Sequence, residues 1–338
     1  MAYAAVVGGA AVLARLSLQP SDAPAQPAQQ YLYTETERPE EFCCAATSAG
    51  NARYIQVFKS NTQGFCTQLK NAALPSSQPL YKASYATHAA SWKQNSTAAA
   101  FTFTFVRDPL DHFISGYSEM ICRKDVSRTR AAAALHAQTE ECARRGCFSW
   151  GNPGQTEAEQ ARAFVQDFSL GRIHPASCCP DVEYRKVVQH VLPQLAFLMD
   201  GIAGRLGSPV PRIDAIGSLE TFDESWARIA DAMPGLPAKY AYDEEPHPCS
   251  DATSENPARA AMTELLKDDA VLGAETRDAF CRQLRYEYAC FGYVPDRVCA
   301  RASEEAMSAK CPISRGEDGA YTAAPGYAEW YSDSDESE

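Results

Sequence analysis

The sequence predicts an α/β fold, because two of its segments have the pattern of a strand that turns directly into a helix. The clearer one starts with Phe101, Phe103 and Phe105, which alternate with threonines as the residues of a half-buried strand do. The apolar positions then change to helical spacing between Leu110 and Tyr117. A strand followed at once by a helix is the repeating unit of α/β sheets.

The turn between this strand and this helix reads Arg107-Asp108-Pro109. Asp108 is a good N-cap and Pro109 suits the first turn of a helix, so Arg107 leaves the carboxyl end of the strand and Ser115 lies on the helix. Ligands of open α/β sheets bind at that edge, and a guanidinium with a hydroxyl near a helix start suits a phosphate monoester. The alternative is a simple strand–turn–helix in which Arg107 only pairs with Asp108.

An earlier segment has the same order of elements. We expect a strand at 54–58, a loop at 59–65 and a helical stretch at 66–71. The loop carries a lysine and two hydroxyl groups, and such a loop directs N–H groups and a cation at an anion. It lacks the Gly-Lys-Ser/Thr order of a Walker A motif, and a plain surface turn is the alternative.

Net charge and its distribution limit the partners. The formal net charge of −12 argues against nucleic-acid binding in general. Seven of the acidic residues lie between Glu317 and Glu338. This composition is typical of a solvated segment, so we expect a disordered acidic tail over 301–338.

The chain has 13 cysteines, and no Cys-x-x-Cys pair recurs with histidines at zinc spacing, so we expect no metal site. Cys142 and Cys147 bracket a short loop and suggest a disulfide-closed turn. Disulfides indicate an oxidising compartment, and the odd count leaves at least one thiol free or paired between chains. The sequon Asn95-Ser96-Thr97 would make a protein of the secretory pathway a glycoprotein.

The N-terminal segment also suggests entry into the secretory pathway. Residues 2–14 are apolar and are followed by Arg15, a run shorter than the roughly 20 residues that span a bilayer. We expect residues 1–16 to be either a signal peptide or a truncated signal-anchor, which would be an N-terminal membrane anchor. Residues 17–48 are expected to form a flexible stem, and 49–300 the folded domain.

The Arg-Asp-Pro turn, with Ser115 and Tyr117 on its helix, resembles the 3′-phosphate-binding segment of sulfotransferases that use 3′-phosphoadenosine 5′-phosphosulfate. It is most similar to that of the carbohydrate sulfotransferases of the secretory pathway. The resemblance implies that Arg107 and Ser115 hold the 3′-phosphate of the donor. This chain has His112 where family members often carry a second arginine. The fold implied is a three-layer α/β sandwich with a mainly parallel central sheet, a P-loop-like donor site and disulfide-stabilised insertions.

In that family the first loop holds the 5′-phosphosulfate, usually as Pro-Lys-x-Gly-Thr. Lys59 matches the lysine that contacts the bridging oxygen of the leaving phosphate, which implies a catalytic role. Phe58 stands in place of the proline and Asn61 in place of the glycine, and asparagine tolerates left-handed backbone geometry. The donor-binding residues implied in this loop are Lys59, Ser60, Asn61, Thr62, Gln63, Gly64 and Phe65.

Two histidines are candidates for the catalytic base. His88 lies in a His-Ala-x-x-Trp stretch where related enzymes place the base, and an ordinary histidine pKa of about 6.5 suits this role. The alternative is a half-exposed histidine on a short helix. His190 is the rival, in a segment at 189–194 that resembles the family's His-Trp-x-Pro-Gln element, although a structural role is also expected for it.

Two further segments resemble the family. The stretch 213–226 follows its pattern of a strand that ends in Ile-Gly-x-x-Glu before a helix, and Glu220 would either anchor that turn or face the active site. The stretch 280–293 resembles its closing helix, in which Leu284, Tyr288 and Phe291 have the spacing of core residues.

The resemblance implies an enzyme that moves a sulfuryl group from 3′-phosphoadenosine 5′-phosphosulfate to a hydroxyl of a carbohydrate acceptor, without a metal, in the Golgi lumen. The alternative is a non-catalytic glycan- or donor-binding protein on the same fold. A kinase on this architecture is disfavoured because the Gly-Lys-Ser/Thr order is missing.

Overall fold

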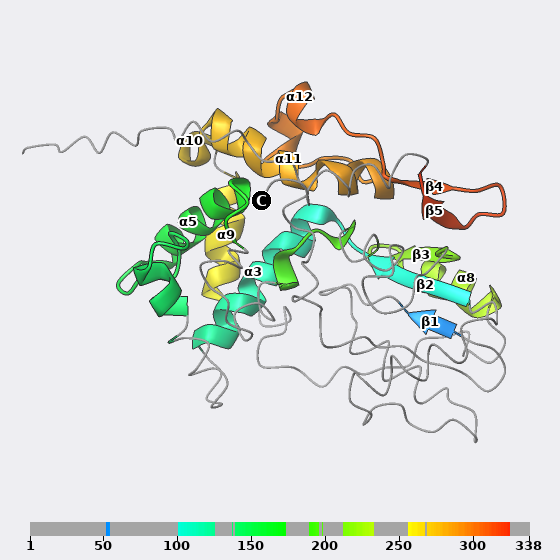
Figure 1. Ribbon diagram of the computed structural model, residues 1–338, viewed down its shortest axis with the longest axis horizontal. Helices are drawn as coiled ribbons and strands as arrows, with labels where there is room; N and C mark the ends of the chain where they lie inside the picture. The colour runs from blue at the N-terminus through cyan, green and yellow to red at the C-terminus, as the bar shows by residue number, and fades with distance from the viewer. Residues whose placement is uncertain are drawn as a thin grey trace, which may run out of the picture.

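The computed structural model describes residues 52–54, 101–125, 137, 139–173, 189–195, 198, 212–232, 256–267 and 269–324. A parallel sheet with the strand order β1-β2-β3 lies on one side of this part of the molecule, and a group of helices lies on the other (Figure 1). The strands are β1 (Ala52–Tyr54), β2 (Phe101–Val106) and β3 (Ala215–Ser218). The α/β class predicted from the sequence is therefore confirmed.

The central strand β2 is buried on both faces. Its threonines, Thr102 and Thr104, are as inaccessible as Phe103 and Phe105, as is typical of a strand in the middle of a parallel sheet. Phe105 lies opposite Gly217 in the register with β3. A Cβ atom on Gly217 would lie 2.6 Å from the Phe105 ring, so glycine is what allows the ring to cross β3.

Strand β2 continues into helix α3 (Pro109–Asp125), as predicted. Helices α9 (Pro257–Lys267) and α11 (Ala274–Phe291) pack against it, and α5 (Glu157–Ser169) contacts it through aromatic rings. An aromatic cluster joins three of these helices: the ring of Phe113 on α3 lies 4.6 Å from that of Phe168 on α5 and 4.9 Å from that of Phe280 on α11. All three rings are fully buried, and each burial contributes about 1.5–3 kcal/mol.

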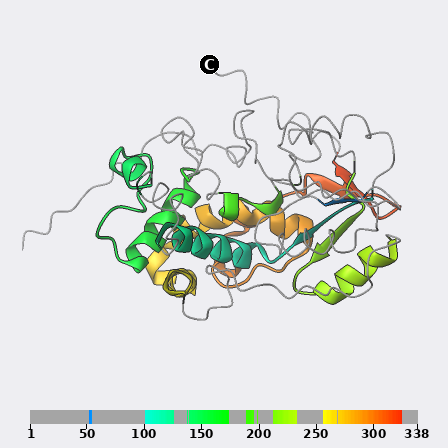
Figure 2. The ribbon, with the colours of Figure 1, turned by 90° about the horizontal axis from the view of Figure 1, so that it is seen from below.

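The remaining elements are short, apart from α8. They are η4 (Gln189–Val191), α8 (Phe222–Ala232), α10 (Asp269–Leu272), η5 (Cys299–Arg301), α12 (Glu304–Met307), β4 (Ile313–Arg315) and β5 (Tyr321–Ala323). Helix α8 packs along β3 at the edge of the sheet (Figure 2). The strand and helix expected after Ile213 are thus present.

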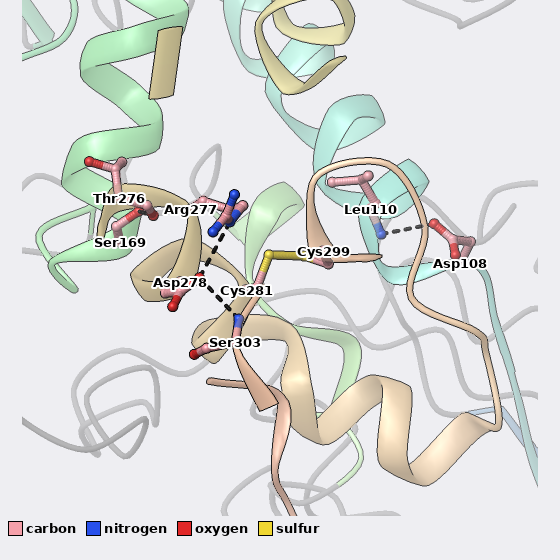
Figure 3. The surroundings of a disulfide bond; sticks show 9 residues. All are labelled: Asp108, Leu110, Ser169, Thr276, Arg277, Asp278, Cys281, Cys299 and Ser303. Carbon is pink, nitrogen blue, oxygen red and sulfur yellow. Dashed lines mark hydrogen bonds and ion pairs between the residues drawn. A yellow bond between two sulfur atoms is a disulfide. The ribbon is translucent and has the colours of Figure 1, made fainter. Parts of the chain in front are cut away.

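The segment after α11 is folded onto the domain. Disulfides Cys281–Cys299 and Cys290–Cys311 attach it to the helix, and the first lies beside a hydrogen bond from the Ser303 N–H to Asp278 (Figure 3). Strands β4 and β5 pair antiparallel. The expected disordered tail from residue 301 therefore does not describe 301–324, because these covalent and backbone links order it; residues 325–338 lie outside the described residues.

The turn between Cys142 and Cys147 is closed by its backbone. The Cys147 N–H donates to the Cys142 carbonyl and the Gly146 N–H to the Ala143 carbonyl, with Gly146 at φ 77°. This is the hydrogen-bond pattern of a Schellman motif at a helix end. Both cysteines, and Cys122, are also disulfide-bonded.

Several expectations fall outside the described residues: the N-terminal segment 1–16, the stem 17–48, the strand residues 55–58 and the loop 59–65. The P-loop-like loop and the three-layer arrangement therefore stay predictions. Among the helices in the described ranges, none is both long and apolar enough to cross a membrane.

Candidate functional site

Arg107, which the sequence predicts to bind a phosphate, lies at the carboxyl end of β2. We call Arg107 and Asp108 together the β2–α3 joint. Asp108 caps α3 as predicted: its Oδ1 accepts hydrogen bonds of 2.9 Å from the N–H groups of both Leu110 and Asp111. Pro109 has no N–H, so the first-turn amides of α3 are already used. An anion at this edge would therefore be held by side chains such as that of Arg107, which is partly exposed.

A glutamine fixes the backbone of Arg107 from both sides. The Arg107 N–H donates to Gln194 Oε1 at 2.8 Å, and Gln194 Nε2 donates to the Arg107 carbonyl, also at 2.8 Å. Gln194 is fully buried. The last paired residues of β2 and β3 are Val106 and Ser218, so Arg107 lies beyond the sheet register. The Gln194 side chain therefore makes the two backbone hydrogen bonds that a neighbouring strand would otherwise make. The Pro-Gln element noted in the sequence thus supports the joint.

A glutamate fixes the next residue of the joint. Glu220 Oε1 accepts the Asp108 N–H at 2.8 Å, and its Oε2 accepts the hydroxyl groups of Ser218 and Tyr293, each at 2.6 Å. Partial burial acts to raise the pKa of Glu220, but the hydrogen bonds from Ser218, Tyr293 and Asp108 outweigh it and hold the pKa below its ordinary value. Of the two roles expected for Glu220, these contacts show that it anchors the turn.

The predicted phosphate ligands Arg107 and Ser115 differ in exposure. Ser115 lies two turns along α3 from Asp108, on the same side of the helix by its spacing of seven residues. It is fully buried, and His112, one turn before it, is 1% exposed. Arg107 thus lies two residues before α3 and Ser115 lies two turns along it, and of the two residues the arginine is the accessible one.

Helix α3 touches η4 at Gly116. A Cβ atom built on Gly116 would lie 2.0 Å from the carbonyl oxygen of His190 and 2.9 Å from a side-chain carbon of Val191. Only a glycine permits this approach, which positions the segment that carries Gln194. His190 itself is buried in η4.

The other predicted site residues cannot be placed. The catalytic candidates Lys59 and His88, and the rest of the loop 59–65, lie outside the described residues. The choice between His88 and His190 as the base therefore stays a prediction. Among the described residues, no group of three or more histidine, cysteine, aspartate or glutamate side chains is arranged to hold a metal ion.

The sequence reasoning missed a buried carboxyl group beside the joint. Glu287 on α11 is fully buried, and its Oε1 accepts the Leu195 N–H at 3.1 Å. Burial raises the pKa of Glu287 to about 8, and the N–H groups of Leu195 and Gln194 offset this only in part. The signal was present: Glu287 follows Phe280 by seven residues and Leu284 by three, so it belongs to the apolar face of the helix.

A second missed feature is an ion-pair cluster on the first turn of α3. Arg297, at a left-handed φ of 48°, donates to Asp111 and to Asp296, each at 2.8 Å. Burial acts to lower the pKa of Arg297, but the bonds to Asp296 and Asp111 outweigh it and raise the pKa. Burial also raises the pKa of Asp108, against the hydrogen bond from Asp111. The cluster holds the segment after α11 against the start of α3.

A comparison with protein families gave a match that spans the residues of this candidate site. Residues 31–293 match the model of the sulfotransferase family. The match includes the β2–α3 joint, Gln194, Glu220 and Glu287, and it ends at Tyr293. Neither the comparison with curated proteins nor the one with solved structures gave a match. Since the family model covers well over half of the chain, the protein belongs to the sulfotransferase family.

Proposed function

We propose that this sulfotransferase uses 3′-phosphoadenosine 5′-phosphosulfate as its donor and a carbohydrate hydroxyl as its acceptor. The observation that carries the proposal is the position of Arg107: a partly exposed arginine at the carboxyl end of a central parallel strand, with its backbone N–H and carbonyl both hydrogen-bonded to Gln194. Ligands of α/β sheets bind at this edge. Because the first-turn amides of α3 are capped, the arginine is the group there that suits a phosphate.

Each residue then has a defined task. Arg107, with Ser115, binds the 3′-phosphate, and the loop 59–65 binds the 5′-phosphosulfate. The acceptor oxygen attacks sulfur in line while the bond from sulfur to the bridging phosphate oxygen breaks. Lys59 stabilises the charge that develops on that oxygen, and His88, or His190 in its place, takes the proton of the acceptor hydroxyl.

We further propose that the enzyme works in the lumen of the secretory pathway, as Golgi carbohydrate sulfotransferases do. Disulfides Cys281–Cys299 and Cys290–Cys311 support an oxidising compartment. A protein that passes through this pathway would carry an N-linked glycan on Asn95, the asparagine of the sequon. An endoglycosidase treatment that leaves the mobility of the cell-expressed protein unchanged would count against this location.

The donor assignment is tested with Arg107→Ala and Lys59→Ala. We expect Arg107→Ala to weaken binding of 3′,5′-diphosphoadenosine by roughly 10- to 100-fold, because it removes a charge-assisted contact. Lys59→Ala should mainly lower turnover, by about 100- to 1000-fold. Titration calorimetry and transfer of radiolabelled sulfate to a mixed glycan pool measure the two effects.

The matched control is Arg162→Ala, which removes an exposed arginine on α5. It should leave both quantities unchanged. Unchanged diphosphoadenosine affinity in Arg107→Ala would contradict the donor assignment. Donor binding without transfer to any glycan would favour a non-catalytic binding protein.

A further inference from the structure

Two consecutive N–H groups of the β2–α3 joint are each held by a side chain from a distant part of the chain. Gln194 accepts the Arg107 N–H and Glu220 accepts the Asp108 N–H, across 87 and 112 residues of sequence. The direction of an arginine side chain depends on the φ and ψ of its own residue and of its neighbour. These two bonds therefore fix the backbone from which the Arg107 guanidinium leaves.

Both of these side chains are linked to α11 or to the residues directly after it. Glu287 on α11 accepts the N–H of Leu195, the neighbour of Gln194, at 3.1 Å. Tyr293, two residues beyond the helix, donates its hydroxyl to Glu220 at 2.6 Å. Helix α11 thus supports Gln194 through Glu287, and the residues directly after the helix support Glu220 through Tyr293.

Helix α11 is well suited to hold a fixed position. Its cysteines Cys281 and Cys290 lie on either side of Glu287 in the sequence, and each forms a disulfide with the segment that follows. Phe280 and Leu284 on the same helix are buried in the core. The segment that carries Gln194 is in turn pressed against α3 at Gly116. The contacts that reach the joint therefore start from a rigid part of the fold.

The two links differ in charge. The pKa of Glu287, raised by burial, keeps it protonated at neutral pH, whereas hydrogen bonds keep the pKa of Glu220 low and this group ionised. The ionised carboxylate is turned toward the Asp108 N–H and two hydroxyl groups, so its charge is directed at donors. Glu287 adds no negative charge near the place of a bound phosphate.

We propose that Gln194 and Glu220 are positioning residues for Arg107, held by α11 through Glu287 and Tyr293, and that together they aim its guanidinium at the phosphate monoester of the donor. The inference rests on the proposed function, which makes Arg107 a donor ligand. It adds a role for four residues that would touch neither donor nor acceptor. The role predicts an effect on donor affinity that a general loss of stability does not produce.

The test uses the full chain with Gln194→Ala and Tyr293→Phe, and 3′,5′-diphosphoadenosine as the probe. We expect Gln194→Ala to weaken binding about tenfold and Tyr293→Phe about threefold, the size of one or two hydrogen bonds. Hydrogen exchange of the Arg107 and Asp108 amides should accelerate, at Arg107 most in Gln194→Ala and at Asp108 most in Tyr293→Phe. Tyr293→Phe removes a single hydroxyl, so it provides a folded variant if Gln194→Ala is unstable.

The matched control is Asp167→Asn, at a carboxyl that is 1% exposed on α5 and bonded to Ser149 rather than to the joint. It should lower the melting temperature and leave the dissociation constant of the probe unchanged. Equal weakening in Asp167→Asn and Gln194→Ala would overturn the inference, as would unchanged binding in both joint variants while Arg107→Ala binds poorly. If Arg107→Ala also binds normally, the donor assignment itself fails and the inference falls with it.

Discussion

Two buried carboxyl groups, Asp167 on α5 and Glu287 on α11, have the same burial and different surroundings. Asp167 is 1% exposed and Glu287 is not exposed at all. Both oxygens of Asp167 accept hydrogen bonds from Ser149, one from its N–H and one from its hydroxyl. Glu287 accepts the Leu195 N–H on Oε1, while its Oε2 has no hydrogen-bond partner among the described residues.

Asp167 is thus a structural carboxylate with both oxygens hydrogen-bonded, whereas Glu287 is buried with one oxygen left without a partner among the described residues. Burial raises the pKa of both groups. At Asp167 hydrogen bonds from Ser149 and from the Trp150 backbone oppose the shift, whereas at Glu287 the bonds from Leu195 and Gln194 offset it only in part and the pKa reaches about 8. An unpaired buried polar atom costs about 1–3 kcal/mol. Buried polar atoms without a hydrogen-bond partner are rare in native proteins and are expected mainly at functional sites. Glu287 supports the segment that carries Gln194, while Asp167 holds a loop far from the joint in sequence.

The largest effect is expected from Gly116→Ala, which crowds the contact between α3 and the segment that Glu287 supports. The Cβ of Gly116→Ala would enter the His190 carbonyl oxygen, so we expect a loss of about 3 kcal/mol or more in the free energy of unfolding, measured in urea. The control is Gly146→Ala, in the turn that precedes Ser149, the residue bonded to Asp167. The Cβ added there meets no atom within 4 Å, so the only strain comes from the φ of 77°. That change should cost about 1 kcal/mol. Equal losses would show that the contact between α3 and η4 adjusts freely.

The next effect concerns pH. The pKa of Glu287 is raised from 4.5 to about 8, so the unfolded chain loses this proton at lower pH than the native protein does. Stability therefore falls as pH rises between these values, by about 2 kcal/mol between pH 6 and pH 7.5. Glu287→Gln should remove this decline, whereas Asp167→Asn should keep it.

Urea titrations at several pH values measure this effect. Burial also raises the pKa of Asp108, so the slope that matters is the difference between wild type and Glu287→Gln. Parallel slopes for these two proteins would show that Glu287 is ionised in the native state, and the contrast with Asp167 would disappear.

The smallest effect is expected from Ser149→Ala, at the residue that donates two hydrogen bonds to Asp167. It removes the hydroxyl that Asp167 accepts at 2.8 Å and keeps the backbone bond. We expect a loss of about 1 kcal/mol in the free energy of unfolding, with unchanged binding of 3′,5′-diphosphoadenosine. Weakened binding would mean that the two regions are energetically coupled.

Local features of the site could be predicted from the sequence. The Asp108 cap, the start of α3 and the position of Arg107 at the end of β2 follow from about ten consecutive residues. Propensity and capping act at that range, so one strand–turn–helix pattern is enough to specify them. The strand that ends at Ser218 was expected instead from the resemblance of the stretch 213–226 to the family pattern.

The contacts that fix the joint could not be predicted. Gln194 and Glu220 lie in segments that resemble the family, but their bonds to Arg107 and Asp108 depend on the order of strands and on how closely η4 approaches α3. The ordered segment 301–324 was missed because disulfide connectivity is not encoded in composition. Its acidic residues suggested a solvated tail.

The separations in sequence within the joint have a consequence for biosynthesis. Strand β2 and helix α3 form from neighbouring residues, but the joint between them needs Gln194, Glu220 and Tyr293, which leave the ribosome later. Contacts between residues far apart in sequence form slowly, and chains are made from the N-terminus. Arg107 therefore emerges early in synthesis and gains its full support only when almost the whole family domain has been translated, which makes this joint one of the last parts of the enzyme to mature.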